Sequence, residues 1–507
     1  MNIINKLRNK VSSDNKHIIK FGLVTLIVTV IALVLNSTII RNFGISAELD
    51  LYVISFVLIT FILKPINDGS IAIFLLPKYI NSKIKQNYLN YNIIIFVLSG
   101  VLISIIFYNL ADHIIKLLFS GLSDLQVANV SQFFRICLIV LPIEFFIGVI
   151  SVYFFSKYDF NFAGKLEILN KIISILLIIL FANDIGVKIL IYAFVINRVI
   201  NFLIIIFIIN FDKIKNELSF EKNFEKKFNF KRNELIKSLF EMFGLIIFHT
   251  ALFSQLNIIG IGIVSLYYFS RQIINGLESF LTRPITIISH TLSSEKNYNE
   301  HDASKILYSF LFKNLFIILL VLVYVFFVGE YFISFLWNKT NINQNISIIY
   351  ILFLMIIDLI LLSNANIFYR FNLAFNRSKF HIVIFKFFLS ILFAFLIYNS
   401  DKFLIINEKI FNLLLIVITF NFTWLLYNLF FFKFISEIFK KINNQSILLK
   451  SLLFFLIQIM VLMPILNFEF FEFDLLNFIF NTLIILLLQV ILTFSNYFKI
   501  LLKIILK

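Results

Sequence analysis

The sequence has few charged residues and very little glycine or proline. Charged side chains make up 14% of the 507 positions, against the quarter or so that is usual in soluble domains. Glycine occurs 13 times and proline 5 times, while apolar residues make up 60%. A water-soluble fold of this size cannot cover that much apolar surface. The scarcity of charge therefore predicts an all-α integral membrane protein whose solvent is the phospholipid bilayer.

Chemical groups that enzymes use are also scarce. Cys137 is the one cysteine, so the chain cannot form an internal disulfide or a cysteine-built metal or redox site. The histidines are scattered without metal-ligand spacing, and there is no glycine-rich phosphate loop, nucleophile elbow or HExxH pattern. These absences argue against an enzyme and an ATP-driven pump. We expect no metal site and no cofactor; the sequence leaves open a coupling ion.

Long apolar runs predict about fourteen transmembrane helices. A spanning helix needs about 20 mostly apolar residues. The second run is interrupted by Lys64, Pro65 and Asp68, and the eighth carries Arg271 and Glu278, so both are expected to face protein or a water-filled cavity. On this rule we predict spans at 21–40, 49–66, 92–110, 133–155, 166–183, 187–209, 237–258, 262–289, 304–328, 346–368, 378–399, 408–432, 449–467 and 475–497.

The distribution of basic residues predicts the topology. With the amino end in the cytoplasm, the inner segments hold 30 of the 44 Lys and Arg residues and the outer loops hold 6. This asymmetry is typical of membrane proteins and places both termini in the cytoplasm. It also explains the net charge of +16 without nucleic-acid binding. The apolar run from Phe21 to Ile40 is too long for the core of a cleaved signal peptide, so we expect it to remain.

The same spans predict two pseudo-symmetric lobes of six helices. The first lobe covers 1–209 and the second 237–440, with two additional helices and a cytoplasmic tail in 441–507. Residues 210–236 join the lobes and carry seven basic residues, and Lys237 directly after them is an eighth. This segment is expected either to act as an amphipathic connector or to lie as a loop against anionic lipid.

Charged residues inside the predicted spans are the candidate functional residues. Each costs at least about 2.5–3.5 kcal/mol at the bilayer centre, so such residues usually face a cavity or a partner. Arg271 and Glu278 are seven positions apart and share a helix face. Three simpler interpretations stay open: Lys64 and Asp68 neutralise each other, Arg198 pins the lobes together, and Arg135, Glu144 and Arg283 are wetted at an interface. The full set is Lys64, Asp68, Arg135, Glu144, Arg198, Arg271, Glu278, Arg283 and Asp358.

Two segments have a recognisable motif. The first is Arg41-Asn-Phe-Gly-Ile-Ser-Ala-Glu-Leu-Asp50, followed by a polar-interrupted helix that ends at Pro77. The second is Gly262-x-Val-Ser-Leu-Tyr-Tyr-x-x-Arg271. Both resemble the MurJ (MviN-type) lipid II flippases of the multidrug/oligosaccharidyl-lipid/polysaccharide (MOP) exporter superfamily, and the second is similar to that family's Gly-x-Val-Ser-x-x-Tyr-Tyr-Ala-x-Arg pattern. The chain departs from the family at His290, where proline is usual, and in the first span, which lacks the family's basic residues.

The resemblance implies a flippase of the bacterial cytoplasmic (inner) membrane. It would move an undecaprenyl-pyrophosphate-linked saccharide from the inner to the outer leaflet by alternating access. Arg271, Lys64 and Arg198 would bind the substrate, while Asp50, Asp68 and Glu278 would form gating ion pairs. The uncharged first span favours an O-antigen or capsule repeat unit over lipid II. Glycosyltransferases or polymerases of the same pathway are possible partners.

Two other functions remain open from the sequence. One is a cation-coupled multidrug exporter of the same superfamily, which needs an acidic, aromatic-lined cavity. The other is a non-transporting scaffold that recruits enzymes of cell-envelope synthesis. Basic residues outnumber acidic ones five to four among the intramembrane candidates, which argues weakly against the exporter. Unpaired charges inside spans argue against a pure scaffold.

Overall fold

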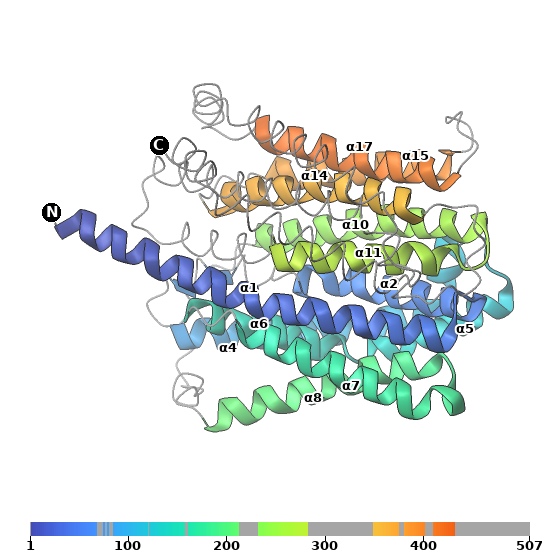
Figure 1. The fold of residues 1–507 in the computed structure, drawn as a ribbon, viewed down its shortest axis with the longest axis horizontal. Coiled ribbons are helices and arrows are strands. Elements are labelled where there is room, and N and C mark those ends of the chain that lie inside the picture. Colours follow the sequence, from blue (N-terminus) through green and yellow to red (C-terminus); the bar gives the residue numbers. More distant parts are fainter. Residues whose placement is uncertain are drawn as a thin grey trace, which may run out of the picture. The chain divides into compact units, whose positions relative to one another are not determined.

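The described residues of the computed structural model are helical and contain no strand. They cover 2–67, 75–76, 79–80, 85–119, 121–157, 161–211, 232–281, 348–374, 380–400 and 409–430. Figure 1 shows the helices of this part of the chain, which are α1 (Asn2–Phe43), α2 (Ala47–Asn67), α4 (Lys85–Leu118), α5 (Asp124–Leu138), α6 (Leu141–Ser156), α7 (Asn161–Ile185), α8 (Lys188–Phe211), α10 (Arg232–Ile259), α11 (Ile263–Leu281), α14 (Ile348–Ala374), α15 (Phe380–Tyr398) and α17 (Lys409–Phe430).

These helices confirm the predicted class of an all-α membrane protein. Every predicted span that falls in the described residues overlaps a helix or a helix pair. Six of these helices are long and apolar enough to cross a membrane, and a seventh span results if α5 and α6 are counted together. The predicted spans 304–328, 449–467 and 475–497 lie outside the described residues, as does most of the connector 210–236. The total of fourteen spans therefore stays a prediction.

The predicted fourth span is a bent pair of helices. It extends from Asp124 to Ser156, and its two helices, α5 and α6, meet at 43°. Pro142 stands in the first turn of α6, where the missing N–H costs nothing because that group has no helical partner. The break thus follows from the position of the proline.

The described residues belong to two compact units. One consists of 1–297 and 370–420, and the other of 298–369 and 421–507. In the second unit, Asn421 Nδ2 donates a hydrogen bond to Asp358 Oδ1 at 2.5 Å, so this intramembrane carboxylate has a polar partner. The predicted lobe boundaries at 209, 237 and 440 remain predictions.

Helices of the first unit pack in close pairs. α1 packs on α7, α4 on α6 and α10 on α15, while α2 contacts α5, α10 and α11. Glycines allow the closest approaches: a Cβ on Gly164 of α7 would lie 2.5 Å from Val24 Cγ1 of α1. A Cβ on Gly244 of α10 would similarly lie 3.1 Å from the Cα of Phe387 in α15.

Large apolar side chains cover the outward faces of several helices. On α4 and α7 they recur at helical spacing and are exposed, as expected for lipid-facing surfaces. Their exposed members include Leu98, Leu102, Ile105, Leu176, Ile179 and Leu180. The chain is therefore a multi-pass membrane protein.

Candidate functional site

The turn between α1 and α2 places Asp50 in the interior of the bundle. Gly44 has φ +64°, and its N–H donates to the carbonyl of Ile40, which ends α1. Ser46 then begins α2, because its hydroxyl accepts from the N–H of Leu49 at 3.3 Å. Asp50 lies in the first turn of α2 and is only 4% exposed.

Asp50 binds the amino end of α11. Its carboxylate accepts hydrogen bonds from the N–H of Gly262 at 2.5 Å and the N–H of Ser265 at 2.8 Å, and a short one from the Ser265 hydroxyl. The first N–H groups of a helix have no internal partner and carry partial positive charge, so an anion is favoured there. Asp50 therefore caps a helix that begins more than 200 residues later in the chain.

The backbone at Gly262 allows this close approach. Its φ of +84° lies in the left-handed region, which a side chain would strain. A Cβ at this position would also lie 2.5 Å from Cγ2 of Ile45 in the α1–α2 turn. The two turns are therefore packed directly against each other.

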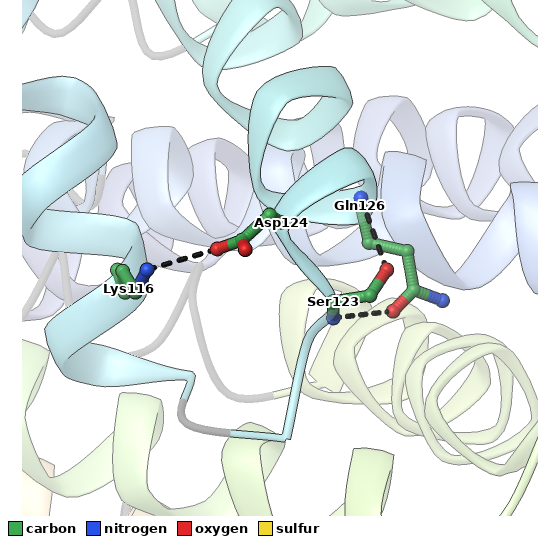
Figure 2. Close-up of polar contacts among 4 residues, drawn as sticks. All are labelled: Lys116, Ser123, Asp124 and Gln126. Atoms are coloured by element: carbon green, nitrogen blue, oxygen red, sulfur yellow. Dashed lines mark hydrogen bonds and ion pairs between the residues drawn. The ribbon is translucent and has the colours of Figure 1, made fainter.

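The α4–α5 turn joins the same end of the bundle. Figure 2 shows how it is fixed: Ser123 caps α5 by accepting from the N–H of Gln126, whose side chain accepts from the N–H of Ser123 at 2.9 Å. Lys116 and Asp124 form an exposed ion pair of 2.8 Å across the turn. The pair and the cap orient α5 relative to the end of α4.

Two further contacts connect this turn region to later helices. A Cβ on Gly121 would lie 3.0 Å from Cγ1 of Ile258 in α10. The hydroxyl of Tyr398 in α15 donates to the carbonyl of Leu118 at 3.3 Å. We call residues 44–50, 118–119, 121, 257–265 and 398 the closed end, because helices from before and after residue 210 meet there.

Helices α1 and α11 remain in contact deeper in the bundle. The hydroxyl of Thr29 lies 2.9 Å from the carbonyl of Thr25 and 3.0 Å from the carbonyl of Gly276 in α11. Residues 29 and 276 are each about three to four helical turns from the closed end, given 3.6 residues per turn. The α1–α11 seam is therefore closed over much of its length.

Aromatic side chains connect three helices below the closed end. Phe56 of α2 makes an edge contact with Phe194 of α8 at 5.3 Å and with Tyr268 of α11 at 6.3 Å between ring centroids. Tyr52 stacks on Phe56 one turn nearer the closed end. We call Tyr52, Phe56, Phe194 and Tyr268 the aromatic bridge.

Arg198 lies one turn beyond the aromatic bridge on α8. Its Nε is 2.5 Å from Oε1 of Glu144 in α6, and its guanidinium lies over the Phe194 ring at 5.3 Å from the centroid. The Arg198 side chain is 23% exposed and that of Glu144 is 1% exposed. Both belong to the first predicted lobe, so this ion pair does not pin two lobes together. The interpretation of Glu144 as wetted at an interface is wrong.

Arg271 lies one turn beyond the aromatic bridge on α11. With Tyr268, Gln272 and Asn275 it forms a half-buried polar face, whereas Ile273 and Ile274 on the other side are buried. Arg198 follows Phe194 by four residues on α8, Arg271 follows Tyr268 by three on α11, and both of these rings contact Phe56. The two predicted residues therefore each lie about one helical turn from a ring of the aromatic bridge, and their convergence in one cavity remains a prediction.

The other predicted residues are placed as follows. Asp50 is bound to α11 in this conformation rather than to a basic side chain, so its gating ion pair remains a prediction for another state. Lys64 lies in α2 and Glu278 in α11, but their side chains are outside the described part, as is Asp68 entirely.

Arg135 pairs with Asp112 at 2.7 Å near the end of α4, and the aromatic bridge does not include either residue. Among the described residues, no three His, Cys, Asp or Glu side chains gather as a metal site.

Comparisons with known proteins show the fold. No family model and no curated protein sequence matches the chain. A solved structure of the lipid II flippase MurJ in an inward closed conformation aligns with a TM-score of 0.67 and 18% identity, over 94% of this chain and 99% of that one. An outward-facing multidrug resistance MATE family transporter of the MOP superfamily aligns at 0.62 and 16% identity, over 84% and 97%.

A third solved structure is a MOP superfamily transporter from Pyrococcus furiosus, whose binding pocket is described as having reversed polarity. It aligns with a TM-score of 0.59 and 15% identity, over 84% of this chain and 96% of that one. The chain therefore has the MOP-superfamily fold, and the predicted resemblance to MurJ and its relatives is confirmed at the level of fold. At these identities the substrate does not follow from the likeness.

Proposed function

We propose that the protein transports an undecaprenyl-pyrophosphate-linked saccharide from the inner to the outer leaflet of the bacterial cytoplasmic membrane. The observation that supports this proposal is that Arg198 and Arg271 each lie about one helical turn from a ring that contacts Phe56, with the Arg198 guanidinium over Phe194. Guanidinium groups bind phosphate oxygens through paired, charge-assisted hydrogen bonds. A site with two arginines therefore suits a pyrophosphate better than a cationic drug.

In this proposal the closed end is the outer gate. The positive-inside asymmetry puts the α1–α2 and α10–α11 turns on the outer side. Asp50 then seals the outer side while the substrate's headgroup enters from the cytoplasm, and its prenyl tail stays in lipid. Arg271 binds the pyrophosphate and Lys64 adds a second positive charge. Release to the outside requires Asp50 to leave α11, after which Asp50, Asp68 and Glu278 pair with basic residues in the alternate state.

The proposal is tested by transport in proteoliposomes. A fluorescent undecaprenyl-pyrophosphate oligosaccharide is placed in the membrane, and a membrane-impermeant quencher reports which leaflet holds it. Protein-dependent equilibration of the label is expected, with no protein-dependent uptake of a cationic dye such as ethidium. Dye transport without lipid translocation would instead establish a multidrug exporter, and neither activity would favour a scaffold for envelope-synthesis enzymes.

The saccharide is distinguished by complementation. We expect the protein to fail to rescue a bacterium whose own lipid II flippase is switched off, because the first span lacks basic residues. The protein's presence in the membrane is checked in the same cells. Rescue of growth would assign lipid II, whereas failure directs the search to an O-antigen or capsule repeat unit.

Substitution of Asp50 is expected to open the outer gate. Asp50→Asn keeps one acceptor oxygen and turns an amide toward N–H donors, so it loses about 3 kcal/mol from hydrogen bonds to a charged acceptor. Labelling of a reporter Gln272→Cys by an impermeant maleimide added outside should rise at least tenfold, in a Cys137→Ala background. Ser265→Ala removes only the hydroxyl donor and should raise labelling a few-fold. Equal labelling in all three proteins would contradict the role of Asp50.

A further inference from the structure

The two side chains of the Glu144–Arg198 pair differ in exposure. Glu144 is 1% exposed, while the Arg198 side chain is 23% exposed. The pair uses Nε of Arg198 and Oε1 of Glu144. In the described part of the chain no other carboxylate binds this guanidinium, whose flat face covers Phe194. The Arg198 guanidinium is therefore more accessible to an anion than the Glu144 carboxylate.

Glu144 has few other sources of stabilisation for a negative charge. It lies in α6, which packs on α2, α4 and α8. From α8 it faces Arg198, the one described charge that acts on it. The described charged side chains of α2 and α4 either have partners of their own or lie at helix ends, so they do not stabilise a charge on Glu144. Asp50 binds α11, Asp112 pairs with Arg135, and Lys116 pairs with Asp124. Without Arg198, a carboxylate at this depth would be an uncompensated buried charge.

Two buried asparagine side chains lie on the same helix as Arg198. Asn197 and Asn201 flank Arg198 on α8, and both are buried. The Nδ2 of Asn197 donates to Ser174 of α7 at 2.7 Å, but Oδ1 of Asn197 and Oδ1 of Asn201 have no donor among the described residues. Donors are thus scarce along the buried face of α8, and a protonated Glu144 carries a donor, whereas an ionised carboxylate carries only acceptors.

We propose that the pyrophosphate of the substrate displaces Glu144 from Arg198, and that Glu144 then takes up one proton. The proposal rests on the proposed function. The ion pair between Glu144 and Arg198 is replaced by one between phosphate and Arg198, and one proton from the water converts the carboxylate to the acid. No covalent bond of the substrate changes. Loading of the anionic headgroup is thereby coupled to loading of one proton, and release of the headgroup restores the ion pair and frees the proton.

The coupling is measured by titration calorimetry of the full chain in nanodiscs with undecaprenyl pyrophosphate. Repeating the titration at pH 7 in buffers of different ionisation enthalpy gives the number of protons bound per ligand. We expect the wild type to take up about one more proton than Glu144→Gln, which removes the competing charge and should bind the ligand about tenfold more tightly. The comparison cancels protons exchanged by the ligand itself.

The outcomes separate this proposal from the proposed function. Binding with the same proton count in both proteins would overturn the exchange and leave the transport of lipid-linked pyrophosphates standing. Absence of binding by the wild type would overturn both. Tighter binding by Glu144→Gln together with loss of about one proton supports both.

A second measurement needs no ligand. In Arg198→Gln the buried Glu144 must be neutral, so the folded protein binds more protons than the unfolded chain and its melting temperature should fall as pH rises from 5 to 9. The double variant Arg198→Gln with Glu144→Gln should lose this additional pH dependence. If Arg198→Gln and the double variant have parallel pH profiles, Glu144 is not the group that takes up the proton.

Discussion

Oxidation of the cysteine pair in a Gly121→Cys, Ile258→Cys double variant is expected to reduce the transport rate at least tenfold. Reduction of the disulfide is expected to restore the rate. A Cβ at Gly121 lies 3.0 Å from Cγ1 of Ile258, so the two Cβ atoms are at most about 4.5 Å apart, within the range of a disulfide. The bridge would join the α4–α5 turn to α10 at the closed end. Because the proposed cycle opens this end for release to the outside, a covalent link across it should trap the inward-accessible state. Lipid translocation in proteoliposomes, with and without oxidant, measures the effect.

Each single cysteine variant is the control for this experiment. Cys137 is buried and is replaced by alanine in all proteins, so no other thiol remains. The single variants should transport equally with and without oxidant. If the double variant is shown to be crosslinked and still transports at the wild-type rate, the closed end does not open during the cycle.

Arg271→Ala is expected to reduce translocation about 100-fold or more while leaving the protein in the membrane. A guanidinium makes two charge-assisted bonds to a phosphate, each worth about 1.5–3 kcal/mol, and alanine makes neither. Arg271→Lys should retain part of the activity, because an ammonium keeps the charge without the paired geometry. The proteoliposome assay, normalised to reconstituted protein, gives all three rates.

Arg135→Ala is the matched control. This arginine also lies in a membrane helix, but it pairs with Asp112 near the end of α4, away from the aromatic bridge. Its loss should change translocation less than twofold. Wild-type transport by Arg271→Ala would exclude Arg271 as a binding residue, and an equal loss in both variants would indicate a general effect on the fold.

The spans were predictable from the sequence because burial in lipid needs only a long apolar run. The ends of the helices were less predictable. The run 92–110 underestimates α4, which extends from Lys85 to Leu118, because a helix continues past the bilayer where Asp112 and Lys116 can be hydrated. The break between α5 and α6 has a signal in Pro142, but an apolar window averages over it.

The partners of the candidate residues were not predictable. Asp50 is bound by backbone N–H groups, which leave no charge pattern in the sequence. Glu144 and Arg198 are 54 positions apart, and two separate apolar runs give no register between them. The link between α8 and α11 runs through Phe56, one of 67 phenylalanines in the chain, so the composition gives no sign of it.

The pairing of α1 with α7 and of α10 with α15 has a consequence for biogenesis. In each case a glycine brings the first helix of a predicted lobe against its fifth, and about 120 residues of chain separate the two partners. At about 5–20 residues per second, translation needs roughly 6–24 s to deliver the partner. Both α1 and α10 are therefore synthesised well before the helices on which they pack, α7 and α15. The same delay occurs once in each predicted lobe during synthesis of one chain.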